Sequence, residues 1–290
     1  MNTTKDDYPT LPADYMIPQD TIAASHRKGH VTLRGICTAE EIEPYRVLMT
    51  EEIERSKSTE LGGIYTKELK DRGTRHNAFM QFMNMWTRDK RLARFILAER
   101  FGHIAAQLLG VDAVRIYHDQ ALFKEPGAGY TPWHQDQFYW PLETGKTVTM
   151  WMPLTPMGAE MGTLIFADGT HQNGPLGELE ISDHSEAYYQ QMIQEQNRTL
   201  AISELHAGDA TWHYGWTLHK APGNTTNRMR QVIAIIFCAA DTRITNPKNE
   251  KQWDDLATWM PGQNPGETIG SRLNPLVWEH TLAHLDTGVR

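Results

Sequence analysis

Five short segments between residues 111 and 240 have the alternating or continuous apolar character of β-strands, and turn sequences such as Pro126-Gly127 and Asp168-Gly169 separate them. Because these strands follow one another with only one helical pattern among them, they favour an antiparallel sandwich or barrel over a parallel sheet. A β-core is therefore predicted in the second half of the chain. The predicted strands are 111–124, 147–154, 162–167, 210–218 and 228–240.

Helical patterns precede these strands and interrupt them once. Thr38 and Glu41 have the spacing of a capping box, so a helix is expected to begin either there or at Pro44, which fits a first helical turn better than a helix interior. Apolar residues recur at three- and four-residue intervals over 89–109, and Gly110 follows where a helix would end. Other predicted elements are a strand at 30–35 and helices at 183–197 and near 250–260.

The segments are expected to form one domain over residues 1–290. An N-terminal arm (1–30) leads into a mostly helical support (31–110), which buttresses the β-core of 111–241 with its helical insertion at 183–197. Residues 242–290 are rich in Pro, Asn and Gly and are expected to form C-terminal loops that serve as a lid or as a contact in a homodimer.

Composition excludes several classes of protein. The 36 acidic residues outnumber the 28 Lys and Arg residues, which argues against a nucleic-acid partner because phosphate binding needs a basic face. The longest apolar stretch, 232–240, has about half the length of a membrane-spanning helix, so no membrane partner is expected. The N-terminus lacks the pattern of a secretory signal, and Cys37 and Cys238 are the only cysteines. These features predict a cytoplasmic protein with buried thiols.

Thirteen histidines make metal binding the first chemistry to examine. If the segment around His134 and Asp136 is a strand, these two residues point to the same face while Gln135 points away. One imidazole and one carboxylate are two of the three ligands of a non-haem iron site, which leaves three metal positions open. A third ligand must come from further along the chain. The candidates are His171, His184, His206, His213 and His219.

Arg230 strengthens the metal interpretation. It lies eleven residues after His219, at the start of a strand whose face it shares with Val232 and Ala234. A guanidinium in an otherwise apolar interior is suited to bidentate capture of a carboxylate, and so to anchoring a dicarboxylate whose other end chelates a metal. A surface salt bridge is the alternative for Arg230.

These residues resemble the phytanoyl-CoA dioxygenase family of Fe(II)/2-oxoglutarate-dependent oxygenases. The resemblance covers about residues 31–241 and depends on the joint order of several motifs. The motifs are 117–127, 133–136, 162–171, Gly208-Asp209, His219, Asn224 and Arg230.

The resemblance implies a double-stranded β-helix, the jelly roll of cupin-like proteins, so the expected fold class is mainly β with flanking N-terminal helices. It also implies that His134, Asp136 and His219 bind Fe(II). His171 belongs to a turn and is expected to be structural. His213, six residues before His219, is the rival for the third ligand, and the spacing to the arginine argues against it.

The cosubstrates implied by the resemblance are 2-oxoglutarate and O2, with Gln120 and Trp151 beside Arg230 in the 2-oxoglutarate pocket. Ordinary core packing is the alternative for Gln120 and Trp151. Four aromatic residues flank the predicted ligands and are expected either at the mouth of a pocket for a largely hydrophobic small molecule or in the core. They are Trp133, Phe138, Tyr139 and Trp140.

The expected function is oxidation of an aliphatic C–H bond, by hydroxylation, in a small molecule such as a specialised metabolite, with decarboxylation of 2-oxoglutarate to succinate. Asp136 argues against a halogenase, since related halogenases have a small residue there. The acidic balance provides no basic cluster for coenzyme A. The alternatives are a metal-dependent cupin-like isomerase or hydrolase that does not use 2-oxoglutarate, and a non-catalytic module that binds 2-oxoglutarate or metal.

Overall fold

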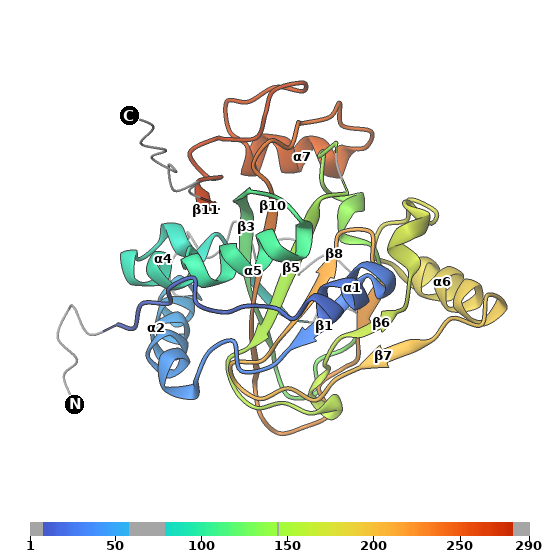
Figure 1. Cartoon of the computed structure of the whole chain (residues 1–290). Coiled ribbons are helices and arrows are strands. Elements are labelled where there is room, and N and C mark those ends of the chain that lie inside the picture. Colours follow the sequence, from blue (N-terminus) through green and yellow to red (C-terminus); the bar gives the residue numbers. More distant parts are fainter. Residues whose placement is uncertain (1–7, 58–78, 144, 281–290) are drawn as a thin grey trace.

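The structure is a computed structural model that describes residues 8–57, 79–143 and 145–280 (Figure 1). The first seven residues of the predicted arm and the last ten of the predicted C-terminal segment lie outside the described residues, as do residues 58–78 of the predicted support. The helices are α1 Gln19–Lys28, α2 Ala39–Lys57, α4 Lys90–Ile96, α5 Glu99–Leu109, α6 Asp183–Glu195 and α7 Glu250–Trp259. The 3-10 helices are η4 Met85–Thr87, η5 Asp136–Phe138, η6 Ala159–Met161 and η7 Thr170–Asn173.

Two antiparallel sheets form the core. The larger has the strand order β1-β8-β5-β10-β3-β11, with β2 also paired to β3, and the smaller has the order β4-β9-β6-β7. Of strands β3 to β10, β3, β5, β8 and β10 lie in the larger sheet and β4, β6, β7 and β9 in the smaller one, with the chain passing between the sheets at every step except β6 to β7. This arrangement confirms the predicted jelly roll. The strands are β1 His30–Leu33, β2 Met80–Met83, β3 Ala113–Lys124, β4 Thr131–His134, β5 Thr147–Pro153, β6 Ile165–Ala167, β7 Leu200–Ile202, β8 Ala210–Tyr214, β9 His219–Ala221, β10 Arg230–Ala239 and β11 Leu276–Glu279.

Helix α5 covers the outer side of the larger sheet, whereas α6 packs against the smaller sheet. In Figure 1, α5 crosses in front of this sheet, α6 lies beside β6 and β7, and α7 lies beyond the ends of β3 and β10. The outward residues Ile233, Ile235 and Phe237 of β10 join the main apolar cluster with Phe101 and Ile104 of α5. Because β10 is buried on both faces, its sequence is continuously apolar rather than alternating.

Several predicted element boundaries were wrong. The arm contains helix α1, which packs against β1, and the C-terminal segment contains α7 as well as β11, which extends the larger sheet beside β3. The helix predicted over 89–109 is interrupted at Leu97 and Ala98. The reason is that α4 packs against α2, whereas α5 packs against β11 and β3, so the chain turns between two surfaces that the apolar periodicity does not distinguish.

Helix α2 begins at the capping box rather than at Pro44. The Thr38 amide donates to Glu41 Oε2 at 2.8 Å, and the Glu41 amide donates to Thr38 Oγ1 at 3.2 Å. These bonds satisfy donors of the first turn that a later start would leave unpaired. Pro44 is accommodated inside the helix, at the cost of one intrahelical hydrogen bond.

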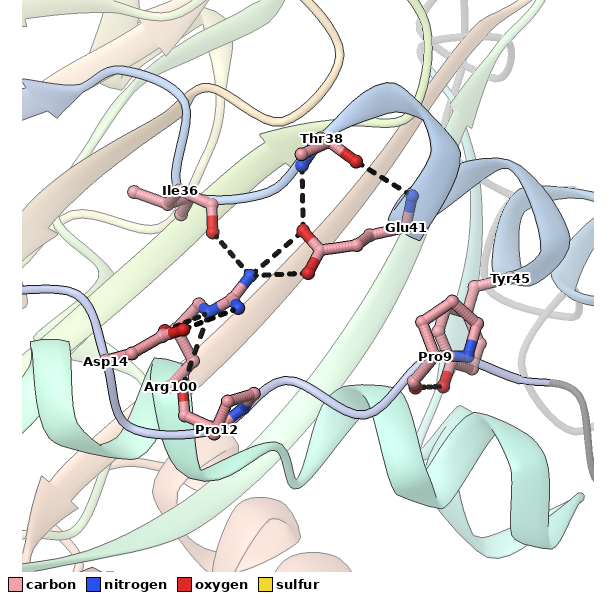
Figure 2. A network of polar contacts seen from close by, with 8 residues as sticks. All are labelled: Pro9, Pro12, Asp14, Ile36, Thr38, Glu41, Tyr45 and Arg100. Carbon is pink, nitrogen blue, oxygen red and sulfur yellow. Dashed lines mark hydrogen bonds and ion pairs between the residues drawn. The ribbon is translucent and has the colours of Figure 1, made fainter.

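Arg100 of α5 connects the N-terminal segment to α2 (Figure 2). Its Nε donates to Asp14 Oδ1 at 2.9 Å, and its Nη1 donates to the Ile36 carbonyl at 3.1 Å and to Glu41 Oε2 at 3.0 Å. The Glu41 carboxylate therefore serves both the helix cap with Thr38 and the buried guanidinium. This network fixes the support helices against the outer face of the jelly roll.

Two further sequence expectations can be compared with the structure. Cys37 and Cys238 are both buried and free, as expected. Within the described ranges, no helix has both the length and the apolar character needed to cross a membrane.

Candidate metal centre

Three side chains from three elements gather between the sheets: His134 at the end of β4, Asp136 in η5 and His219 at the start of β9. In the β4-β9 ladder His134 lies directly opposite His219, and their ring centroids are 4.1 Å apart. Asp136 Oδ1 lies 3.5 Å from His134 Nε2 and 3.7 Å from His219 Nε2. One ligand atom from each residue lies within 4.8 Å of the others. Two imidazole nitrogens and one carboxylate oxygen form the facial donor set that suits Fe(II).

The backbone around Asp136 differs from the predicted continuous strand. β4 ends at His134, and Asp136 is the first residue of a 3-10 turn. Gln135 between them keeps an extended backbone (φ −118°, ψ 122°), so the alternation still holds across the three residues. The Gln135 amide points away and donates to the carbonyls of Gly174 at 2.9 Å and Trp216 at 2.7 Å. It thereby holds the loops around the centre.

Each histidine of the cluster has a defined tautomer. The Nδ1 of His134 lies 2.7 Å from the Pro132 carbonyl, and the Nδ1 of His219 lies 2.9 Å from the Thr217 carbonyl. Because a carbonyl oxygen only accepts, both Nδ1 atoms carry the proton and donate it. The lone pair is then on Nε2, the atom that faces Asp136. This is the usual arrangement of metal-binding histidines.

The protonation states also suit a cation. Burial lowers the pKa of His219 well below its ordinary value, and the neighbouring imidazoles of His134 and His213 act in the same direction. Burial alone would raise the pKa of Asp136, but His219, His134 and His213 together hold it well below the ordinary range. A neutral imidazole and an ionised carboxylate are the forms that bind a metal, because neither must first lose a proton.

The other histidine candidates lie outside this cluster. His213 of β8 is fully buried, and its Nε2 lies 3.1 Å from Asp136 Oδ2, on the far oxygen of the carboxylate. His171 donates from Nε2 to the His26 carbonyl at 3.1 Å, in agreement with a structural role. The remaining two candidates, His184 and His206, are exposed.

The predicted 2-oxoglutarate residues lie on the inner face of the larger sheet. In the register of β10, Ala234 pairs with Gln120 on one side and with Trp151 on the other, so these side chains share that face. Arg230 is 2% exposed, its Cζ lies 5.4 Å from the centroid of a Trp151 ring, and its Nη1 donates to the Gly162 carbonyl at 2.8 Å. The structure thus brings Arg230 and Trp151 into contact and places Gln120 in the same row.

A second buried basic residue, Lys124, lies beside Arg230 and was missed in the sequence. The two residues are direct partners in the β3-β10 ladder. Lys124 Nζ donates to the carbonyls of Gly129 at 2.8 Å and Pro222 at 2.9 Å, and burial together with Arg230 lowers its pKa to about 6. The signal that could have revealed it is a lysine at the end of a predicted strand, directly after the apolar residues Ala121, Leu122 and Phe123.

The surroundings of Arg230 and Lys124 fit an acidic ligand. Within the described residues, no carboxylate forms an ion pair with either Arg230 or Lys124, and the buried Nε of Arg230 has no hydrogen-bond acceptor. A buried donor without an acceptor is costly, so it indicates that a ligand completes the site. One carboxylate of 2-oxoglutarate would supply the negative charge and the acceptor atoms that the Arg230 guanidinium lacks.

Three motif residues hold the site in place. Gly162 has φ +84°, and a Cβ there would lie 2.3 Å from the Pro222 carbonyl oxygen, so only glycine fits beside the Arg230 contact. Thr170 Oγ1 accepts from the amide of Leu218, directly before the ligand His219. The Asn224 amide donates to the carbonyls of Lys124 at 3.1 Å and Arg228 at 2.7 Å. These contacts give a structural reason for Gly162, Thr170 and Asn224 in the sequence motifs, although none of the three belongs to the cluster of His134, Asp136 and His219.

The aromatic predictions are only partly matched. Trp133 is fully buried, joins the cluster of Tyr189 and Ile193 under α6, and donates from Nε1 to Gln190 Oε1 at 3.1 Å. Its placement at a pocket mouth was wrong, because the residue before His134 in a strand must face the opposite side. The other three aromatics have different surroundings, and Trp140 has the core position that was its alternative. Trp140 packs with Tyr117 and Trp259 below α7, Phe138 lies in η5, and Tyr139 accepts from the Ile181 amide at 2.9 Å.

Comparisons with solved structures define the class of fold. The non-heme alpha ketoglutarate dependent carbocyclase SnoK from nogalamycin biosynthesis aligns over 92% of this chain and 99% of its own, with a TM-score of 0.72 and 20% sequence identity. The chain is therefore a jelly-roll protein with the same overall fold as SnoK. At this level of identity, the similarity concerns the fold alone.

The family follows from the sequence match. The model of the family described as phytanoyl-CoA dioxygenase matches residues 25–232, so the chain belongs to the phytanoyl-CoA dioxygenase family, as predicted. The family takes its name from a dioxygenase, and the cluster of His134, Asp136 and His219 is a group that could hold a metal ion.

Two curated relatives match about half of the chain. Phytanoyl-CoA dioxygenase domain-containing protein 1 of Danio rerio is 24% identical over 46% of this chain and 48% of its own length. The 1-deoxypentalenic acid 11-beta-hydroxylase of Streptomyces exfoliatus is 27% identical over 50% of this chain and 51% of its own. The chain thus spans about half the length of the curated relatives it matches.

Proposed function

We propose that this protein uses Fe(II), 2-oxoglutarate and O2 to oxidise an aliphatic C–H bond of a largely hydrophobic small molecule, by hydroxylation. The observation that carries the proposal is the joint presence, in one jelly-roll interior, of the His134, Asp136 and His219 cluster and of the buried Arg230 without a carboxylate partner among the described residues. Neither feature alone would specify a cosubstrate that binds a metal at one end and a cation at the other.

The spacing of the two features fits a short dicarboxylate. Thr149 of β5 donates to Asp136 Oδ2 at 3.3 Å, and Trp151 of the same strand contacts Arg230. Residues two apart on a strand share a face and lie about 7 Å apart. A five-carbon diacid can therefore extend along β5, with its keto-acid end at the metal and its other carboxylate at Arg230.

Each group of residues has a distinct task in this proposal. The iron, when bound, supplies the oxygen-activating chemistry that side chains lack. The Nε2 atoms of His134 and His219 and the Oδ1 atom of Asp136 would hold the iron. Arg230 orients the diacid by charge and hydrogen bonding. The apolar residues Phe166 and Val232 of the interior cluster exclude water from the site.

The substrate class follows from the surroundings and from the relatives. Phe138 and Tyr139 adjoin Asp136 and are proposed to line the substrate entrance, opposite the charged cosubstrate end. The relative from Streptomyces exfoliatus is, by its name, a hydroxylase of 1-deoxypentalenic acid. This supports hydroxylation of a mainly apolar substrate here, whereas the name of SnoK indicates that this fold also serves carbon ring formation.

The test uses the purified full chain under anaerobic conditions with Fe(II) and 2-oxoglutarate. We expect a weak visible charge-transfer band in the wild type, and its loss in His134→Ala and Arg230→Ala but not in the exposed-surface control Lys90→Met. On admission of air with candidate substrates, succinate should form. An unchanged band in both site variants would refute the assignment.

The same experiment separates the alternative functions. A cupin-like isomerase or hydrolase would bind the metal but be indifferent to 2-oxoglutarate and to the loss of Arg230. A non-catalytic module would bind 2-oxoglutarate without forming succinate in the presence of O2. The cytoplasmic location and the homodimer contact stay predictions from the sequence.

A further inference from the structure

His213 lies next to the three proposed metal ligands but is not one of them. It lies in β8, is 1% exposed, and pairs in register with Thr149 of β5. Both side chains reach the same atom: His213 Nε2 lies 3.1 Å from Asp136 Oδ2, and Thr149 Oγ1 donates to that oxygen at 3.3 Å. Two residues from adjacent strands of the larger sheet thus hold one oxygen of the metal-binding carboxylate.

The contact defines the tautomer of His213. An ionised carboxylate only accepts hydrogen bonds, so His213 Nε2 carries the proton and donates it to Asp136. Its lone pair is then on Nδ1, which is buried and has no hydrogen-bond partner. This is the reverse of His134 and His219, whose Nδ1 atoms donate to backbone carbonyls. His213 therefore presents a proton, not a lone pair, toward the carboxylate, which argues against the role of third ligand.

The two oxygens of Asp136 consequently have different surroundings. Oδ1 lies near His134 Nε2 and His219 Nε2, where the metal would bind, whereas Oδ2 is held by two donors on the other side. A carboxylate without such donors can bind a metal through both oxygens. Bidentate binding would occupy a fourth position and leave two of six. Two positions hold the keto-acid end of 2-oxoglutarate but leave none for O2.

We propose that His213, assisted by Thr149, is a positioning residue that restricts Asp136 to binding the metal through Oδ1 alone and so keeps three positions open. This inference rests on the proposed function, because it concerns the coordination of the proposed iron. His213 touches neither cosubstrate in this proposal, and its effect passes through Asp136. The Phe166 ring beside His213, with centroids 5.3 Å apart, contributes packing that any large side chain would partly retain.

The experiment compares His213→Phe, which removes the donor but keeps a flat ring, with His213→Gln, which keeps an N–H donor, and with Thr149→Val, which removes the second donor at equal size. Each protein is loaded with Co(II) in place of iron. Calorimetry then measures 2-oxoglutarate binding to the metal-saturated protein, and the visible Co(II) spectrum reports the coordination. Thermal unfolding of the metal-free proteins controls for folding.

We expect His213→Phe to shift the visible Co(II) spectrum, because the second oxygen of Asp136 would then bind the metal, with a smaller shift for Thr149→Val and partial recovery of the wild-type spectrum in His213→Gln. All three variants should still bind 2-oxoglutarate, since two metal positions remain for its keto-acid end. An unchanged spectrum in a folded, metal-saturated His213→Phe protein would overturn the inference. If that variant fails to fold, an unchanged spectrum in Thr149→Val would overturn it. Failure of the metal-loaded wild type to bind 2-oxoglutarate would instead refute the proposed function.

Discussion

Lys124, the partner of Arg230 in the β3-β10 ladder, permits a quantitative test of how burial changes the protonation of this basic group. Its side chain is 0% exposed, its ammonium group donates to two backbone carbonyls, and burial together with the adjacent Arg230 lowers its pKa to about 6. Replacement by Met removes the titrating group and retains an unbranched apolar side chain of similar length. The variant Lys124→Met should therefore change how stability depends on pH.

The direction and size of the change follow from proton linkage. Unfolding returns Lys124 to water, where a lysine has a pKa of about 10.4, so between about pH 6 and pH 10 the unfolded chain binds one more proton than the folded chain. The free energy of unfolding then rises with pH by about 1.4 kcal/mol per unit from this residue alone. Between pH 7 and pH 9 the wild type should gain about 3 kcal/mol that Lys124→Met lacks.

Urea unfolding monitored by tryptophan fluorescence at pH 7, 8 and 9 measures this difference. The exposed lysine variant Lys90→Met is the matched control and should follow the wild-type pH dependence. Other titrating groups contribute equally to all three proteins, so the difference in slope isolates Lys124. Parallel slopes for the wild type and Lys124→Met would show that Lys124 keeps its proton in the folded chain and would refute the reasoning.

Three further predictions concern elements around the site. Burial raises the pKa of Asp255 to about 7, and this residue accepts from the Tyr117 hydroxyl at 2.8 Å. The stability that protonated Asp255 contributes should therefore be lost as pH rises from about 4 through 7. In urea unfolding, the free energy of unfolding of Asp255→Asn should depend less on pH over this range. Arg100→Met should lower the free energy of unfolding by about 1–3 kcal/mol, because buried acceptors lose their donor. Gly208→Ala should lower the melting temperature, since a Cβ at φ +93° would lie 2.0 Å from the Cys37 carbonyl oxygen.

Matched variants make these three predictions specific. Exposed Asp254→Asn should leave the pH dependence unchanged, and an equal effect of both Asn variants would contradict the role of Asp255. For Arg100→Met, wild-type urea stability would contradict the network. Gly127→Ala shares the positive φ of Gly208 but meets no atom within 4 Å, so equal losses at both glycines would show that backbone strain, rather than the clash, is responsible.

Local sequence patterns were sufficient for much of the fold but not for its boundaries. The capping box of Thr38 and Glu41 marked the start of α2 correctly, because its hydrogen bonds involve only neighbouring residues. The same kind of pattern failed at Leu97 and Ala98, where the chain turns between two packing surfaces without a Gly or Pro to mark the change. Helix α1 was missed since it begins without a side-chain cap.

In the candidate site, too, local motifs identified some residues, whereas others could be recognised only from long-range packing. His134, Asp136, His219 and Arg230 were selected from the order and spacing of motifs, and the structure brings them into one interior. Spacing did not reveal Lys124, since its importance depends on being opposite Arg230 in a ladder between strands more than one hundred residues apart.

By itself, the sequence determined an antiparallel β-core, because alternation and turn residues are local properties of the chain, and the order of its motifs implied the family, the jelly roll and a preference for His219 over His213. Only the tertiary structure shows which histidine lies with His134 and the near oxygen of Asp136 and which contacts the far oxygen. His219 is opposite His134 in one sheet, whereas His213 is opposite Thr149 in the other. This difference arises from strand register and the packing of two sheets, which are long-range properties.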